Sequence, residues 1–179
     1  MGQVIAVHRS DQHDFSKQKV ETVELVAGVG VAGDVHAGSS VQHRSRVALD
    51  PGQPNLRQVH LLASEVLESL AGAGPPVAPG DLGENITTSG IDLHALGVGT
   101  VLRIGESALV AVTGLRNPCA QIDDFRPGLL RQLRYRDDDG VLVRRAGIMG
   151  VVVLGGVVSV GDGIEASAPP GPHRPLDRV

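Results

Sequence analysis

The sequence predicts a mainly β domain, a closed or partly closed barrel with two or three short helices. The 24 glycines and 11 prolines among 179 residues divide the chain into many short segments. Most of those segments are apolar or β-branched runs of strand length, separated by glycine turns. The chain lacks the regular strand–helix alternation of α/β folds, and it has no Walker or dinucleotide-binding glycine fingerprint. Many short strands with few helices are typical of barrels.

Strands are expected first at residues 4–8 and 20–27. Residues 20–27 alternate between two faces as in a strand, although polar and apolar residues are not cleanly separated between those faces. Residues 28–38 are glycine-rich. Residues 39–55 show no clear period and are expected as an ordered loop or a short strand. A short apolar run at 59–62 comes next.

The clearest helix signal in the first half covers residues 64–70. Ser64 is expected to cap the N-terminus, and Val66, Leu67 and Leu70 share one face. Glycines and prolines within 72–76 end the helix.

Residues 100–104 and 108–113 predict a hairpin around Gly105-Glu106, because both segments are rich in β-branched residues. A second helix is expected at 125–135, where leucines form one stripe. The acidic run that ends at Gly140 interrupts it.

The apolar run 148–154 predicts a strand buried on both faces. Glycine turns then lead to strands at 157–160 and 164–166. We expect one domain over residues 1–179, with a motif-bearing core from about 28 to 166. Residues 167–179 hold four prolines and are expected as a flexible tail.

Composition excludes several classes of function. A net charge of −4 argues against a general nucleic-acid binder, and 2% aromatic residues leave no platform for stacking single-stranded bases. No apolar run approaches the roughly 20 residues that span a bilayer, so no membrane association is expected. The first residues do not resemble a secretory signal, and one cysteine allows no internal disulfide, so we expect a cytoplasmic protein.

The single cysteine, Cys119, is the first candidate functional residue. It follows Arg116, Asn117 and Pro118, between an expected strand and a helical segment. Four roles remain open for it: a buried small residue, a nucleophile, a persulfide carrier, or one soft ligand of a metal whose other ligands come from elsewhere. A guanidinium close by favours the thiolate, and Pro118 fixes φ just before the sulfur, so the setting favours chemistry.

Two further clusters precede it. The glycine-rich segment 30–38 carries Asp34 and His36, and its glycines would let the backbone approach a ligand; a simple glycine turn with an Asx bond from Asp34 is an equal alternative. Arg57 and Gln58 stand before an apolar run and are suited to an anion or the edge of a ring.

His60, inside that apolar run, is expected to be a core histidine with a satisfied ring. Glu84 and Asn85 lie within an expected strand against β propensity, which points to a site. The alternative is a β-bulge in which Asn85 bonds to the backbone.

Arginines concentrate in the second half of the chain. They are expected to form a solvated face whose positive charge is offset by the acidic run 137–139. The alternative is that one or two of them bind a phosphate. The set is Arg126, Arg131, Arg134, Arg136, Arg144 and Arg145.

Taken together and in this order, these segments resemble the MOSC family, named for the C-terminal domain of molybdenum-cofactor sulfurase. The similarity runs from about residue 28 to 166, nearly all of the expected ordered chain. The segments that carry it are 30–38, 57–62, 80–86, 116–119 and 145–148, followed by Gly155-Gly156 and Gly161-Asp162. The only cysteine stands at the family's cysteine position.

The resemblance implies a barrel-like domain whose cysteine faces a pocket for the molybdenum cofactor (molybdopterin). Cys119 would then be the molybdenum ligand or carry a persulfide. The residues expected around the pterin and its phosphate are Arg57, Gln58, Glu84, Asn85, Arg116 and Asn117. A carboxylate such as Asp34, Glu84 or Asp123 would move protons while water leaves an N–OH group.

Three functions follow from this resemblance and these residues. The first is reduction of N-hydroxylated small molecules with electrons from an external donor protein, because the chain has no ferredoxin-like cysteine cluster of its own. The second is a sulfur carrier or cofactor-handling module, with Cys119 loaded by a cysteine desulfurase. The third is an interaction module with a structural cysteine. In some family members an aromatic residue follows the cysteine, whereas this sequence has Ala120 at that position.

Overall fold

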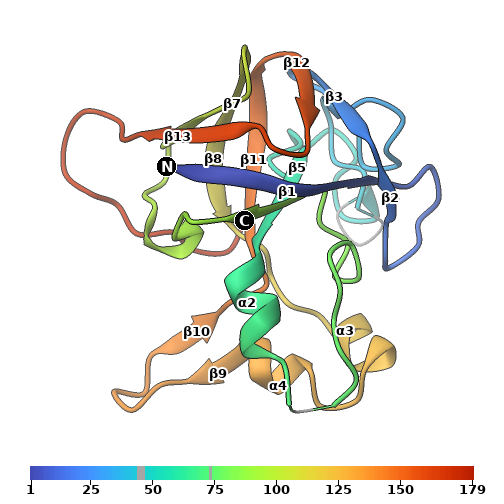
Figure 1. Ribbon diagram of the computed structural model, residues 1–179, viewed down its shortest axis with the longest axis vertical. Coiled ribbons are helices and arrows are strands. Elements are labelled where there is room, and N and C mark those ends of the chain that lie inside the picture. Colours follow the sequence, from blue (N-terminus) through green and yellow to red (C-terminus); the bar gives the residue numbers. More distant parts are fainter. Residues whose placement is uncertain (44–46, 73) are drawn as a thin grey trace.

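The computed structural model describes residues 1–43, 47–72 and 74–179, and its centre is a closed barrel (Figure 1). Seven strands follow one another around it in the order β13-β7-β8-β11-β5-β6-β1, and β1 closes the ring by pairing with β13. The pair β5–β6 is parallel, and the other pairs of the ring are antiparallel. The strands are β1 (Gly2–Arg9), β5 (Val59–Ala63), β6 (Ile86–Ser89), β7 (Val101–Ile104), β8 (Ala108–Leu115), β11 (Ile148–Leu154) and β13 (Gly163–Ser167). The predicted fold class is confirmed.

Two smaller sheets accompany the barrel. β12 (Gly156–Ser159), β3 (Thr22–Val26) and β4 (Gly30–Val31) form a three-stranded sheet, and β2 (Gln18–Val20) extends the barrel sheet from β1. The predicted strand 20–27 is therefore interrupted at Glu21. β9 (Arg134–Arg136) and β10 (Leu142–Arg144) form a hairpin that lies beside the helices, below the barrel in Figure 1.

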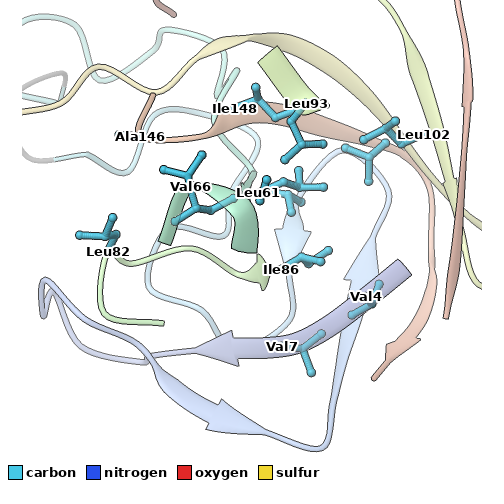
Figure 2. Packing of buried hydrophobic residues seen from close by; sticks show 14 of the residues in the cluster. Val4, Val7, Leu61, Val66, Leu82, Ile86, Leu93, Leu102, Ala146 and Ile148 are labelled. Carbon is cyan, nitrogen blue, oxygen red and sulfur yellow. The ribbon is translucent and has the colours of Figure 1, made fainter. Parts of the chain in front are cut away.

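Alternating side chains fill the barrel. β8 shows the pattern directly, because every second residue from Ala108 onward is buried. Figure 2 shows apolar side chains from distant segments meeting in one core, among them Val7, Leu61, Ile86 and Ile148. Burying each of these side chains stabilises the fold by about 2 kcal/mol relative to leaving it exposed.

β5 is buried along its whole length, and it carries His60. Its parallel neighbour β6 and its antiparallel neighbour β11 cover both edges. The expectation of burial on both faces over 148–154 is wrong for the end of β11, where Val153 and Leu154 are exposed.

The hairpin of β7 and β8 and the helix expected at 64–70 are confirmed, the latter as α2 (Ser64–Ser69). Ser64 does not cap it: the N-cap position is Ala63, and no side chain caps that end. A short 3-10 helix, η1 (Leu93–Ala95), has Asp92 as its N-cap, and the Asp92 carboxylate accepts hydrogen bonds from two backbone N–H groups.

The single helix expected at 125–135 is wrong. The segment forms α3 (Gln121–Phe125) and α4 (Leu130–Leu133), and the chain then enters β9. Arg126 is extended before Pro127, and Gly128 has a φ of +82°, so the backbone leaves helical geometry between the two helices.

The last residues, expected as a flexible tail, lie along the barrel instead. Leu115 N–H donates to the Asp177 carbonyl at 2.8 Å, and Val98 N–H donates to the Arg174 carbonyl at 2.9 Å. Gly114 makes room for this segment, because a Cβ there would collide with the Asp177 carbonyl.

Part of the expected loop 39–55, residues 44–46, lies outside the described residues. In the rest of that loop, Ser40 and Pro54 form an isolated β-bridge. Among the described residues, no helix is long and apolar enough to cross a membrane.

Candidate functional site

A cavity of about 510 Å³ opens where the glycine-rich loop, the segment before β6 and the segment after β8 meet. Cavities of this size commonly hold small molecules and cofactors. Its wall includes Cys119 together with residues from the connection between β1 and β2, from β5 and from the start of β11. The lining residues are His13, Asp14, Phe15, Lys17, His36, His43, Arg57, His60, Leu82, Gly83, Asn85, Arg116, Asn117, Cys119, Ala120, Gln121, Asp124 and Met149.

Cys119 lies where the chain turns from β8 into α3. Its thiol is half-buried and donates to Oε1 of Gln121 at 3.5 Å. The carbonyl of Cys119 accepts a hydrogen bond from Ile122 N–H at 3.1 Å. The backbone thus fixes the sulfur at the wall of the cavity while leaving it accessible to a ligand.

Arg116 gives the wall a buried positive charge. Its Nη1 is buried with no hydrogen-bond partner in the described part of the chain, and its Cζ lies 5.8 Å from the centre of the Phe15 ring. Burial lowers the pKa of Arg116, while the Cys119 sulfur and the Glu84 carboxylate act in the opposite direction and favour the charged form. An unsatisfied guanidinium N–H beside a cavity is suited to an anionic ligand.

Histidines line the entrance on the side of the glycine-rich loop. The ring centres of His36 and His43 are 4.5 Å apart, and those of His13 and His36 are 5.7 Å apart. Burial and the charge of neighbouring cations lower the pKa of His43 to about 3, so this ring is neutral at pH 7. Among the described residues, no group of three or more His, Cys, Asp and Glu side chains has an arrangement that would hold a metal.

Asp34 lies directly behind the lining and organises it. Its carboxylate is 2.7 Å from Nζ of Lys17, accepts from Asn85 Nδ2 at 3.0 Å, and closes the expected Asx bond with His36 N–H at 3.0 Å. Burial would raise the pKa of Asp34, but the hydrogen bonds from His36 and the charge of Lys17 outweigh burial and hold the pKa well below its usual range. The carboxylate is therefore ionised throughout the neutral range.

Asn85 connects β5 and β1 to Asp34. Its Oδ1 accepts from His60 N–H at 3.1 Å, and its Nδ2 also reaches the carbonyl of His8 at 3.3 Å. Asn85 does bond to the backbone, as the bulge alternative required, and it also lines the cavity. Nε2–H of His60 donates to the Ala146 carbonyl at 2.8 Å, so it is the satisfied core histidine that the sequence predicted.

Glu84 is fully buried beneath the cavity. Its Oε1 accepts from Gly80 N–H at 2.6 Å and from Thr87 Oγ1 at 2.9 Å, while Oε2 has no partner among the described residues. Burial raises the pKa of Glu84. The protonated form is thereby favoured relative to an exposed glutamate.

The fold brings five of the predicted site residues onto the wall of this cavity, and four others lie elsewhere. Those on the wall are Arg57, Asn85, Arg116, Asn117 and Cys119. Asp34 and Glu84 support the wall from behind. Gln58 connects the turn between β3 and β4 to β11. Its Nε2 donates to the Gly28 carbonyl at 2.9 Å, and its Oε1 accepts from Val152 N–H at 2.9 Å.

Asp123 lies away from the cavity wall. Its Oδ1 accepts from Leu130 N–H at 2.7 Å and so connects α3 to the start of α4. Arg126 also departs from the expected solvated face: it is buried, and its Nη1 donates to the carbonyl of Pro75 at 2.6 Å.

Sequence reasoning missed several lining residues, above all Lys17, His13 and His43. They lie in connections without a periodic pattern, and no motif marks them. A lysine and two histidines among polar loop residues are ordinary in sequence; only the closure of the barrel brings them to Cys119.

The family model for the MOSC domain matches residues 32–165, well over half of the chain. The chain belongs to the MOSC family. The YuaD protein from Bacillus subtilis has a similar crystal structure, with 24% identity over 94% of this chain and 97% of that one and a TM-score of 0.77. No curated protein matches the chain significantly.

Two YiiM proteins share the fold more distantly. YiiM from Geobacillus stearothermophilus is 18% identical, and the match covers 93% of this chain and 75% of that protein. YiiM from Escherichia coli is 20% identical, and the match covers 96% of this chain and 73% of that protein. Both structures have a TM-score of 0.62. This barrel fold is thus shared by chains whose sequences have diverged widely.

MOSC domains are associated with the molybdenum cofactor, and the residues of the cavity fit that group. One accessible thiol suits a metal that takes its other sulfur ligands from the pterin. The buried Nη1 of Arg116 has no acceptor among the residues that the structure describes, and a phosphate oxygen would supply one. The side-chain amides of Asn117 and Gln121 have the donors and acceptors that the edge of a pterin ring requires.

Proposed function

We propose that this MOSC protein binds the molybdenum cofactor in the cavity described above, with the Cys119 thiolate as a ligand of the metal, and that it reduces N-hydroxylated small molecules with electrons from an external donor protein. One observation carries the proposal: the only thiol of the chain lines a cavity whose wall also holds Arg116, and Nη1 of that guanidinium has no hydrogen-bond partner among the described residues. The bound cofactor would supply a two-electron redox centre.

The side chains of the wall divide the work of binding. Arg116 and Arg57 would bind the phosphate of the cofactor through charge-assisted hydrogen bonds. Asn117 and Gln121 would orient the pterin, and Gln121 already accepts from the Cys119 thiol. The Phe15 ring, whose centre lies 5.8 Å from Cζ of Arg116, would support the guanidinium through a cation–π contact.

The overall reaction consumes two electrons and two protons for each N–OH group: the N–O bond breaks, an N–H group remains and water leaves. The electrons come from the donor protein. His36 lies on the wall with its Nδ1 3.3 Å from Oδ1 of Asp34, so this pair can hold a proton next to the substrate. In this proposal Asp34 orients and stabilises the imidazole, because its own carboxylate stays ionised.

The test is molybdenum and pterin content of protein purified from a cofactor-producing host. We expect Cys119→Ser to lose most of the molybdenum, and Arg116→Gln to lose pterin and molybdenum together. Arg131→Gln, an exposed arginine on α4 away from the cavity, is the matched control and should keep both. Full molybdenum content in Cys119→Ser would refute ligation by the cysteine. Reduction of an N-hydroxylated base with a chemical electron donor then tests turnover.

The accessible thiol also favours a second candidate function, sulfur transfer. Cys119 would accept a sulfur atom from a cysteine desulfurase and hold it as a persulfide in the cavity. Intact-mass measurement after incubation with a desulfurase and cysteine should then show one added sulfur atom on the wild type and none on Cys119→Ser. An unchanged wild-type mass would rule this function out.

A further inference from the structure

A second cavity, of about 560 Å³, lies between α2, the end of β6, η1 and β10. It shares no lining residue with the cavity at Cys119. The MOSC assignment and the proposed reduction make no use of it.

One part of its wall is apolar. Ala63 and Val66 are buried at the junction of β5 and α2, while Ile91 and Val143 approach from the segment after β6 and from β10. Apolar walls with a few polar groups are typical of sites for small organic ligands.

The acidic residues of this wall already have hydrogen-bond partners. Oε1 of Glu65 accepts from Gly90 N–H at 2.7 Å, and Oδ1 of Asp92 accepts from the N–H groups of His94 and Ala95 at 3.1 and 3.2 Å. These carboxylates therefore fix the loop and the start of η1, and their negative charge is partly offset by backbone N–H dipoles.

The basic residues of this wall have no such partners among the residues that the structure describes. Nε of Arg144 and Nε2 of His94 are buried without a hydrogen bond in the described part of the chain. Neither Arg144 nor Arg145 takes part in an ion pair among those residues. A buried donor without an acceptor costs about 1–3 kcal/mol, which a ligand carrying acceptor atoms would offset.

We propose that the second cavity binds a small organic carboxylate with a hydrocarbon body. The carboxylate pairs with Arg144 and Arg145 and hydrogen-bonds to the ring nitrogen of His94. The hydrocarbon body packs on the wall formed by Val66, Ile91 and Val143. This site is independent of the proposed function at Cys119.

Calorimetric titration with hexanoate and with benzoate tests the proposal, and hexanol and acetate serve as the matched probes. We expect saturable binding of at least one of the two carboxylates, and about tenfold weaker binding by hexanol, which lacks the charge, and by acetate, which lacks the hydrocarbon body. Binding of neither carboxylate, or equal binding of hexanol or acetate, would overturn the proposal.

Five variants locate the site. Arg144→Gln and Arg145→Gln should each weaken carboxylate binding about tenfold, and Val143→Trp should abolish it by filling the cavity from a half-buried position on β10. Arg131→Gln, on α4, should bind as the wild type does. Binding that survives Val143→Trp, or that Arg116→Gln removes, would place the ligand elsewhere and refute the assignment. Circular dichroism melting confirms that each variant is folded.

Discussion

Nζ of Lys17 lies 2.7 Å from Oδ2 of Asp34, and both side chains are almost completely buried beside the cavity that holds Cys119. Lys17 comes from the connection between β1 and β2, and Asp34 from the loop after β4. The pair therefore joins two loops that do not pair as strands. Burial lowers the pKa of Lys17, while the charge and hydrogen bond of Asp34 act in the opposite direction.

Removing Lys17 should destabilise the fold strongly. Lys17→Met would leave the Asp34 carboxylate buried without its cation, and we expect the free energy of unfolding to fall by about 3 kcal/mol in urea titrations. The double variant Lys17→Met with Asp34→Asn should recover part of the loss, because it also removes the buried negative charge. A single variant as stable as the wild type would show that the ion pair contributes nothing.

His8 should make the protein sensitive to mild acid. The ring is fully buried, both ring nitrogens lack hydrogen-bond partners among the described residues, and burial with the charges of Lys19 and Lys17 lowers the pKa from 6.5 to about 4. Because the folded-state pKa lies below the unfolded one, the stability is complete above pH 6.5 and is lost as the pH falls toward 4. The loss amounts to about 3 kcal/mol.

Urea unfolding between pH 7 and pH 4.5 measures this effect. His8→Leu should lose less stability over the same range than the wild type, since leucine does not titrate. Identical pH dependence in the two proteins would argue against His8 as the source.

Gln58→Leu distinguishes a structural role from a cofactor contact. Both ends of the amide bond to backbone groups of other segments, the Gly28 carbonyl and the Val152 N–H. We expect a loss of about 2 kcal/mol in unfolding free energy, because two buried polar groups lose their partners. Molybdenum content per folded molecule should stay unchanged. Gln53→Leu, at an exposed position, is the stability control. If Gln58→Leu instead had normal stability and a reduced molybdenum content, Gln58 would belong to the cofactor site.

Gly80 should not tolerate a side chain. Its φ is +92°, and a Cβ would lie 2.7 Å from Cδ2 of His8 and 2.8 Å from the carbonyl oxygen of Lys17. Gly80→Ala should lower the melting temperature by an amount that corresponds to about 2 kcal/mol.

Gly28 isolates the backbone contribution to that loss. It has a φ of +70° and no atom within 4 Å of a Cβ, so Gly28→Ala should cost only the backbone strain, about 1 kcal/mol. Equal losses in the two variants would show that the contacts with His8 and Lys17 do not matter.

Local signals in the sequence predicted much of the fold. The hairpin of β7 and β8 was predictable because β-branched runs flank Gly105-Glu106, and α2 because its apolar residues repeat at helical spacing. The single helix expected at 125–135 does not form, although leucines repeat at helical spacing, because Pro127-Gly128 interrupts the backbone hydrogen bonds.

By itself the sequence determined the positions of most barrel strands, the position of the single thiol and membership of the MOSC family. The strands depend on residues near one another in the chain, and the family membership depends on the order of several short motifs along it. The tertiary structure alone decided that β1 closes the barrel on β13, that Lys17 meets Asp34, and that Gln58 and Asp123 bond to backbone instead of lining the cavity. Strand pairing between distant segments sets these relationships, and no local pattern of charge or hydrophobicity encodes which distant partner each side chain meets.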